Sequence, residues 1–116
     1  MSTREKSIID VHAHVGTSLT LSVGGDAKQI LEIMDDNDII QSVISPIPGY
    51  EDPDGIKDAM LQNNNIADMV KKWPDRFPRG LGVVEPRHGS RALPEVDRIF
   101  EELNLAGLMF HNDFNG

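Results

Sequence analysis

Two histidines near the start of the chain are its most promising chemical groups. Residues 10–14 read Asp-Val-His-Ala-His and directly follow an apolar pair. Side chains of a β-strand alternate between its two faces. If a strand begins over 8–11 and continues through the motif, Asp10, His12 and His14 share one face and the apolar residues between them share the other. Two imidazoles with an acidic neighbour at a strand end are typical of a divalent metal site.

The metal chemistry of this pair is incomplete. Neutral imidazole suits zinc, and also iron, nickel or copper, whereas a catalytic zinc normally takes three protein ligands and keeps one open position. The chain has no cysteine, which excludes thiolate ligands. We expect His12 and His14 to be metal ligands and the cofactor to be a divalent metal, zinc in the first place and manganese as the alternative. The two histidines could also be ordinary polar residues at a strand end. For Asp10 we favour a structural hydrogen-bond acceptor over a partner of the ligands.

Length, composition and charge narrow the class of protein. The 116 residues suffice for one domain, expected over 1–116, and 39% of them are hydrophobic. The net charge is −8, without a basic run, which disfavours nucleic acid and anionic membranes as partners. The polar N-terminal residues show no apolar signal segment, and no run is long enough to span a bilayer. We therefore expect a cytoplasmic protein that acts on a small molecule.

Apolar runs and helical periodicity alternate along the chain. Strands are predicted over 8–11, 39–44, 80–84 and 107–110, and helices over 27–37, about 59–72 and 94–103. Asp26 and Gln29 form a capping-box pattern at the first helix. Strands that alternate with helices predict a parallel sheet with right-handed crossovers.

Ligand sites in such folds lie at the carboxyl ends of the strands. Besides the two histidines of 10–14, Glu85 and His111 fall at such ends. Pro86 after Glu85 favours a turn role for that carboxylate. For His111 two interpretations stay open, a side chain that faces substrate or a loop-start histidine bonded to backbone. We interpret the asparagines at 63–65 as helix-packing residues, and 87–90 as a solvated loop.

Three segments resemble one enzyme family. The sequence Ile-Ile-Asp-Val-His-Ala-His-Val at 8–15 resembles the opening of the amidohydrolase superfamily. Asn-Asn-Ile-Ala at 64–67, followed by Trp-Pro-Asp-Arg-Phe at 73–77, resembles the second helix and its exit in one branch of that superfamily. The branch contains aminocarboxymuconate-semialdehyde decarboxylase and the resorcylate-type decarboxylases. Gly-Leu-Met-Phe-His at 107–111 is similar to its fourth strand.

This resemblance implies a TIM (β/α)8 barrel, of which a chain this short supplies about four β/α units, against ~250 residues for a typical barrel. It also implies a metal bound by His12 and His14 with further ligands from later strands. The activity would be hydrolysis of a C–N or C–O bond, or non-oxidative decarboxylation of a small carboxylic acid. We expect the chain to be an N-terminal fragment that is inactive by itself.

A rival interpretation is a non-catalytic half-barrel protein. A half-barrel has open sheet edges that must be covered. Two copies could pair as a homo-oligomer, or the protein could only bind metal.

Overall fold

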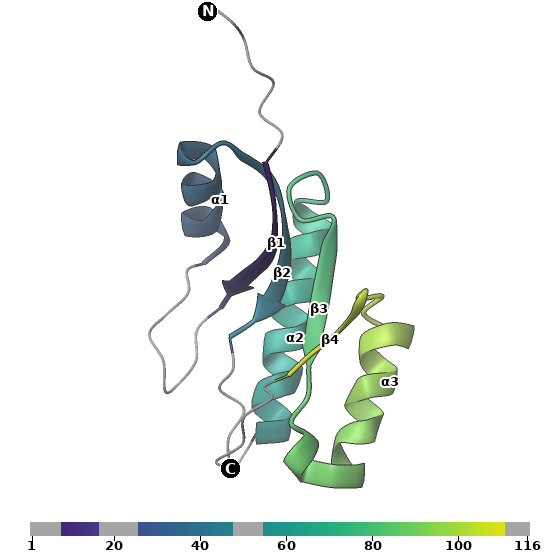
Figure 1. Ribbon diagram of the computed structural model, residues 1–116. Helices are drawn as coiled ribbons and strands as arrows, with labels where there is room; N and C mark the ends of the chain where they lie inside the picture. The colour runs from purple at the N-terminus through teal and green to yellow at the C-terminus, as the bar shows by residue number, and fades with distance from the viewer. Residues whose placement is uncertain (1–7, 17–25, 48–54, 111–116) are drawn as a thin grey trace, which may run out of the picture.

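Four parallel strands alternate with helices in the computed structural model, which describes residues 8–16, 26–47 and 55–110. The strands lie side by side in chain order, β1-β2-β3-β4, and all neighbouring pairs are parallel (Figure 1). This confirms the parallel sheet predicted from the sequence. The elements are β1 (Ile8–Val15), α1 (Ala27–Asp36), β2 (Ile39–Pro46), α2 (Gly55–Lys72), β3 (Arg79–Val83), the 3-10 helix η1 (Pro86–Ala92), α3 (Leu93–Glu101) and β4 (Gly107–Met109).

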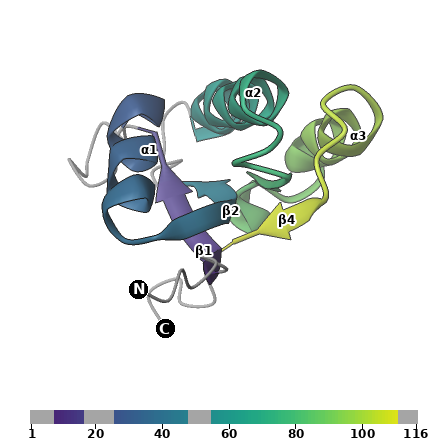
Figure 2. The same ribbon diagram turned by 90° about the horizontal axis from the view of Figure 1, so that it is seen from above.

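The α-helices form a layer on one face of the sheet, and no helix of the described residues covers the other face (Figure 2). Each helix returns the chain to the same end of the sheet, so the carboxyl ends of the strands meet at one edge (Figure 1). No helix in the described ranges combines the length and apolar character needed to cross a membrane. The layered arrangement corresponds to part of a barrel whose interior face lies away from the helices.

The core lies between the sheet and this helix layer. Glycines of β3 let the helices approach closely, because a Cβ on Gly82 would lie 2.7 Å from Cδ1 of Ile99 in α3. A Cβ on Gly80 would lie 2.6 Å from Cγ2 of Ile66 in α2. The largest fully buried apolar side chains are those of Val15, Met34, Ile44, Pro46, Ile66, Phe77, Val83 and Ile99.

The capping box predicted at the start of α1 is present in the structure. The Asp26 side chain accepts the Gln29 backbone N–H at 2.9 Å, and the Gln29 side chain accepts the Asp26 N–H at 3.2 Å, so the capping box is present. At the other end, Asp35 pairs with Arg76 at 2.7 Å. Arg76 also donates to the carbonyls of Ile39 and Ile40. The Pro-Asp-Arg-Phe segment thus anchors the start of β2.

The interpretation of 87–90 as a loop is wrong, although Arg87, Gly89 and Ser90 are exposed as predicted. These residues belong to η1, in which Gly89 adopts a φ of 60° and His88 is half-buried. The Glu85 side chain accepts the Arg87 N–H and caps this short helix. Pro86 supplies the fixed φ of a first helical position, which explains why a helix forms there.

Candidate metal centre

The two histidines of β1 converge on one point. Their Nε2 atoms lie 2.9 Å apart, with ring centroids separated by 4.8 Å and ring planes inclined at 75°. The strand continues through the motif as predicted, but its pairing with β2 shifts register between Asp10 and Ala13. Such a bulge re-aims side chains. Asp10 accepts the His12 backbone N–H at 2.9 Å inside the bulge, which confirms its structural role.

Residues of the neighbouring strand β2 contact the His14 ring and hold it in place. In the parallel ladder it lies opposite Ser45, near the carboxyl end of β2. Its Nδ1 lies 3.0 Å from the Pro46 carbonyl oxygen and 3.1 Å from Ser45 Oγ. Because a carbonyl oxygen only accepts, Nδ1 carries the proton in this arrangement, and in the neutral ring Nε2 then carries the lone pair.

The pair has the donor chemistry and spacing of two metal ligands. Two imidazole nitrogens 2.9 Å apart could bind the same divalent ion. Within the ranges that the structure describes, no group of three or more His, Cys, Asp or Glu side chains could hold a metal. The residues therefore fit a divalent metal as two of its ligands.

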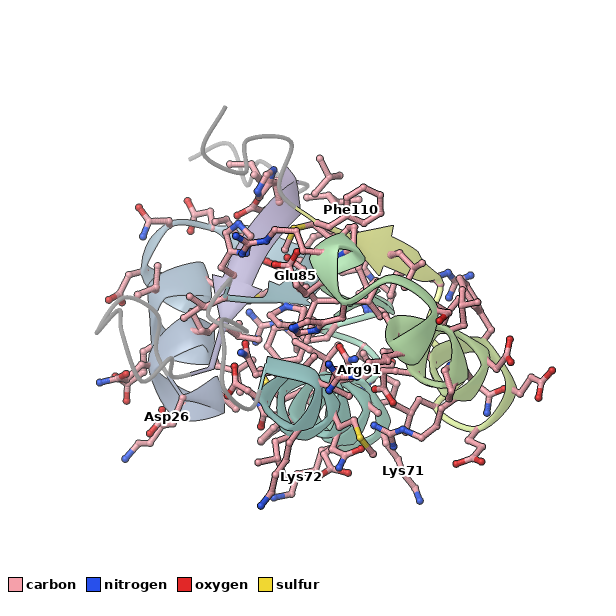
Figure 3. The ribbon with its side chains drawn as sticks, turned by 90° about the horizontal axis from the view of Figure 1, so that it is seen from below. Asp26, Lys71, Lys72, Glu85, Arg91 and Phe110 are labelled. Carbon is pink, nitrogen blue, oxygen red and sulfur yellow. The ribbon has the colours of Figure 1, made fainter. Side chains whose placement is uncertain are left out.

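Glu85, at the end of β3, faces its own turn. Its side chain is only 3% exposed and accepts three hydrogen bonds from Arg87, at 2.9, 3.0 and 3.1 Å. Burial would raise the pKa of this carboxyl, but the hydrogen bonds and the positive charge of Arg87 outweigh burial and hold the pKa below its ordinary value. Glu85, between β3 and η1, is labelled in Figure 3. The predicted turn role is confirmed.

A buried polar cluster joins the same end of β3 to two helices. Asn63 of α2 accepts the Val83 N–H at 2.7 Å and donates to the Val83 carbonyl at 2.9 Å and to Glu95 at 2.8 Å. Arg98 binds Glu95 at 2.6 Å, and this hydrogen bond raises the pKa of the guanidinium. The packing role predicted for Asn63 is confirmed.

Sequence reasoning missed the role of Glu95. The structure buries this side chain, 5% exposed, between Asn63 and Arg98. The i, i+3 spacing of Glu95 and Arg98 was the available signal, since residues three apart are neighbours on a helix surface.

His111, predicted to bind substrate, lies outside the described residues, so its role stays a prediction. The preceding residue, Phe110, is 52% exposed after the end of β4 (Figure 3).

Comparisons with solved structures find the same fold in decarboxylases. The 5-carboxyvanillate decarboxylase of Sphingomonas paucimobilis aligns with 92% of this chain and 43% of its own, at 23% identity and a TM-score of 0.72. The corresponding enzyme of Novosphingobium aromaticivorans, complexed with manganese and 4-hydroxy-3-methoxy-5-nitrobenzoic acid, aligns with 90% of this chain and 41% of its own, at 17% identity and a TM-score of 0.75.

A dihydroxybenzoic acid decarboxylase of a Polaromonas species, with bound manganese and the inhibitor 2-nitroresorcinol, aligns with 86% of this chain and 36% of its own. Its identity is 21% and its TM-score 0.68. No protein-family model and no curated protein matches the chain.

These neighbours are amidohydrolase-superfamily members with TIM barrels. The chain spans about two fifths of their length. The half-barrel fold predicted from the sequence is confirmed. The described residues have the fold of part of the TIM barrel that these amidohydrolase-superfamily proteins share.

Proposed function

We propose that this chain supplies the first two metal ligands of a metal-dependent enzyme of the amidohydrolase superfamily. The observation that carries the proposal is the convergence of His12 Nε2 and His14 Nε2, 2.9 Å apart, at the carboxyl end of β1. This is where parallel β/α folds place their ligand sites. We propose 1–116 as a single partial barrel domain and a divalent metal as its cofactor.

The reaction that we propose is non-oxidative decarboxylation of a small hydroxylated carboxylic acid. The support is that the neighbours are named as decarboxylases of 5-carboxyvanillate and dihydroxybenzoate, and two of those described above hold manganese. Manganese is therefore as strong a candidate as zinc. In the reaction the carbon–carboxyl bond breaks, carbon dioxide leaves, and a proton takes its place. Hydrolysis of a C–N or C–O bond is the other activity open to this superfamily fold.

The chain's own residues have limited tasks in this proposal. His12 and His14 bind the metal, and the bulge held by Asp10 directs them toward one point. The metal, when bound, supplies positive charge that orients the oxygens of the substrate. His111, which follows β4 in the sequence, is proposed to contact the substrate. The remaining ligands come from outside the described residues.

A second candidate function is that of a non-catalytic protein whose copies pair. The observation that favours it is that β1 has only β2 as a strand neighbour among the described residues, and that its Ile8, Ile9 and Val11 are 53%, 52% and 72% exposed. An exposed apolar edge strand is a template for pairing with another chain. In this alternative, histidines from two copies share the metal.

Metal binding tests the proposal. We would titrate the purified chain with Mn²⁺ and with Zn²⁺ and compare the His12→Ala, His14→Ala double variant with His88→Ala, a control in η1. We expect binding to be lost only in the double variant. Binding that survives in the double variant would refute the proposed site.

Mass and activity separate the two candidate functions. Light scattering of the metal-loaded protein distinguishes one chain of 12.9 kDa from a pair. For the enzyme fragment we expect a monomer without carbon dioxide release from dihydroxybenzoate, because a catalytic zinc normally takes three protein ligands. A metal-dependent dimer that fails to decarboxylate would favour the second candidate.

A further inference from the structure

We propose that Ser45 is a positioning residue of the metal site, and that it prepares His14, but not His12, for the metal. The inference rests on the proposed metal-binding function and concerns how the protein fixes the protons of the two imidazoles. In this view the neutral His14 ring already has its lone pair on Nε2 before any metal arrives. His12 must first move a proton from Nε2 to Nδ1.

The argument for His14 starts from its two oxygen partners. The Pro46 carbonyl at 3.0 Å only accepts, so the Nδ1–H of His14 donates to it. Ser45 Oγ at 3.1 Å then also lies in an accepting position, and one N–H is shared between two oxygens. Ser45 is 4% exposed and lies opposite His14 in the parallel ladder, so the sheet register itself sets this contact.

The state of His12 follows from that of His14. With its proton on Nδ1, His14 has a lone pair at Nε2, and a second lone pair 2.9 Å away would be repelled. Between two neutral rings, the contact of the two Nε2 atoms therefore places the proton of His12 on Nε2, from which it is donated to His14. His12 is exposed, which leaves solvent free to exchange its ring protons.

To hold a metal through both Nε2 atoms, the two histidines would have to give up this shared proton. The neutral His12 ring loses its Nε2 proton to water and gains one at Nδ1, so the exchange releases no net proton. His14 needs no such change, because Ser45 and the Pro46 carbonyl already hold the ligand tautomer. Outer partners of metal-bound histidines typically change metal affinity by about 10- to 100-fold when removed.

The same strand offers a matched control for Ser45. Ser42 is also on β2 and is 1% exposed, but its hydroxyl has no hydrogen-bond partner among the described residues. Ser42→Ala and Ser45→Ala thus each remove one buried hydroxyl, and only the second hydroxyl touches a proposed ligand. Ser45→Thr keeps a hydroxyl at this position and is the conservative variant.

The first measurement is the tautomer of each histidine in the metal-free protein, by long-range ¹H–¹⁵N correlation spectra with ¹⁵N-labelled histidine. We expect His14 to carry its proton on Nδ1 and His12 on Nε2. A His14 protonated on Nε2 in the unmodified chain would overturn the proposal, and this result does not depend on whether any variant folds.

The second measurement is Zn²⁺ affinity by competition with a chelating dye. We expect Ser45→Ala to weaken binding about 10- to 100-fold, while Ser42→Ala and Ser45→Thr stay close to the unmodified chain. Equal affinities for Ser45→Ala and Ser42→Ala would overturn the positioning role. If the His12→Ala, His14→Ala variant also kept its metal, the proposed function itself would fail, so the two failures are distinguishable.

Discussion

Replacement of Asn63 by alanine tests whether the buried amide holds β3 to the helices. The Asn63 side chain is fully buried and makes three hydrogen bonds, two with the backbone of Val83 and one with Glu95. The variant would leave the Val83 N–H and carbonyl without these partners. Glu95 keeps its two bonds from Arg98 and is less affected.

The expected loss follows from the groups left unpaired. A buried polar group that loses its partner costs about 1–3 kcal/mol. Two such groups on Val83, with the small cavity left by the amide, give a loss of about 3–5 kcal/mol in the free energy of unfolding. A domain of this size has about 5–15 kcal/mol in total. The variant should stay folded if the total free energy of unfolding exceeds this loss, and its urea midpoint should be much lower.

Urea denaturation followed by circular dichroism measures this loss. Asn65→Ala is the matched control, because Asn65 is an exposed neighbour in the same helix whose side-chain bond in the described structure is a 3.8 Å contact with Met69 sulfur. We expect the control to change stability by at most about 0.5 kcal/mol. Asn63→Asp keeps the shape but cannot donate to the Val83 carbonyl, and should be destabilised similarly. A loss for Asn63→Ala that matches the control would refute the reasoning.

Two further predictions concern β3. Gly82→Ala should cost about 1–3 kcal/mol through overpacking, because the new Cβ would lie 2.7 Å from Cδ1 and 2.9 Å from both Cγ atoms of Ile99. Thermal unfolding measures this loss, which should be smaller in an Ile99→Ala background, because alanine lacks all three carbons. An equal loss in both backgrounds would show that the clash is not the cause. The pKa of Glu85 in the folded protein lies below its ordinary value of 4.5. The charged carboxylate therefore stabilises the fold above pH 4.5, and this stabilisation is lost as the pH falls through the folded-state pKa. Glu85→Gln should therefore lower stability at pH 7 and have a much smaller effect in acid, and a loss independent of pH would contradict the assignment.

Local sequence patterns determined most of the elements. The capping box of Asp26 and Gln29 fixed the start of α1, since its bonds join residues three apart. The helical periodicity predicted from about 59 located α2, although the helix begins earlier, at Gly55. Alternation of strands with helices was enough to predict a parallel sheet, because short right-handed crossovers leave few other arrangements.

The two histidines could be singled out from their spacing on one strand, and the alternation of strand side chains accounts for their shared face. The spacing did not reveal the bulge between Asp10 and Ala13, since a bulge depends on the register with the neighbouring strand. Nor could it identify the partners of His14, which lie more than 30 residues away in the chain.

Only the tertiary structure decided which polar groups are buried together. Asn63, Val83 and Glu95 are distant in the chain and meet because α2 and α3 pack on the same strand. Once buried, their polar atoms must pair with one another, because water is no longer present to do so. Residue type and spacing therefore determined the elements and the candidate ligands, whereas strand register and helix packing decided how each side chain is held.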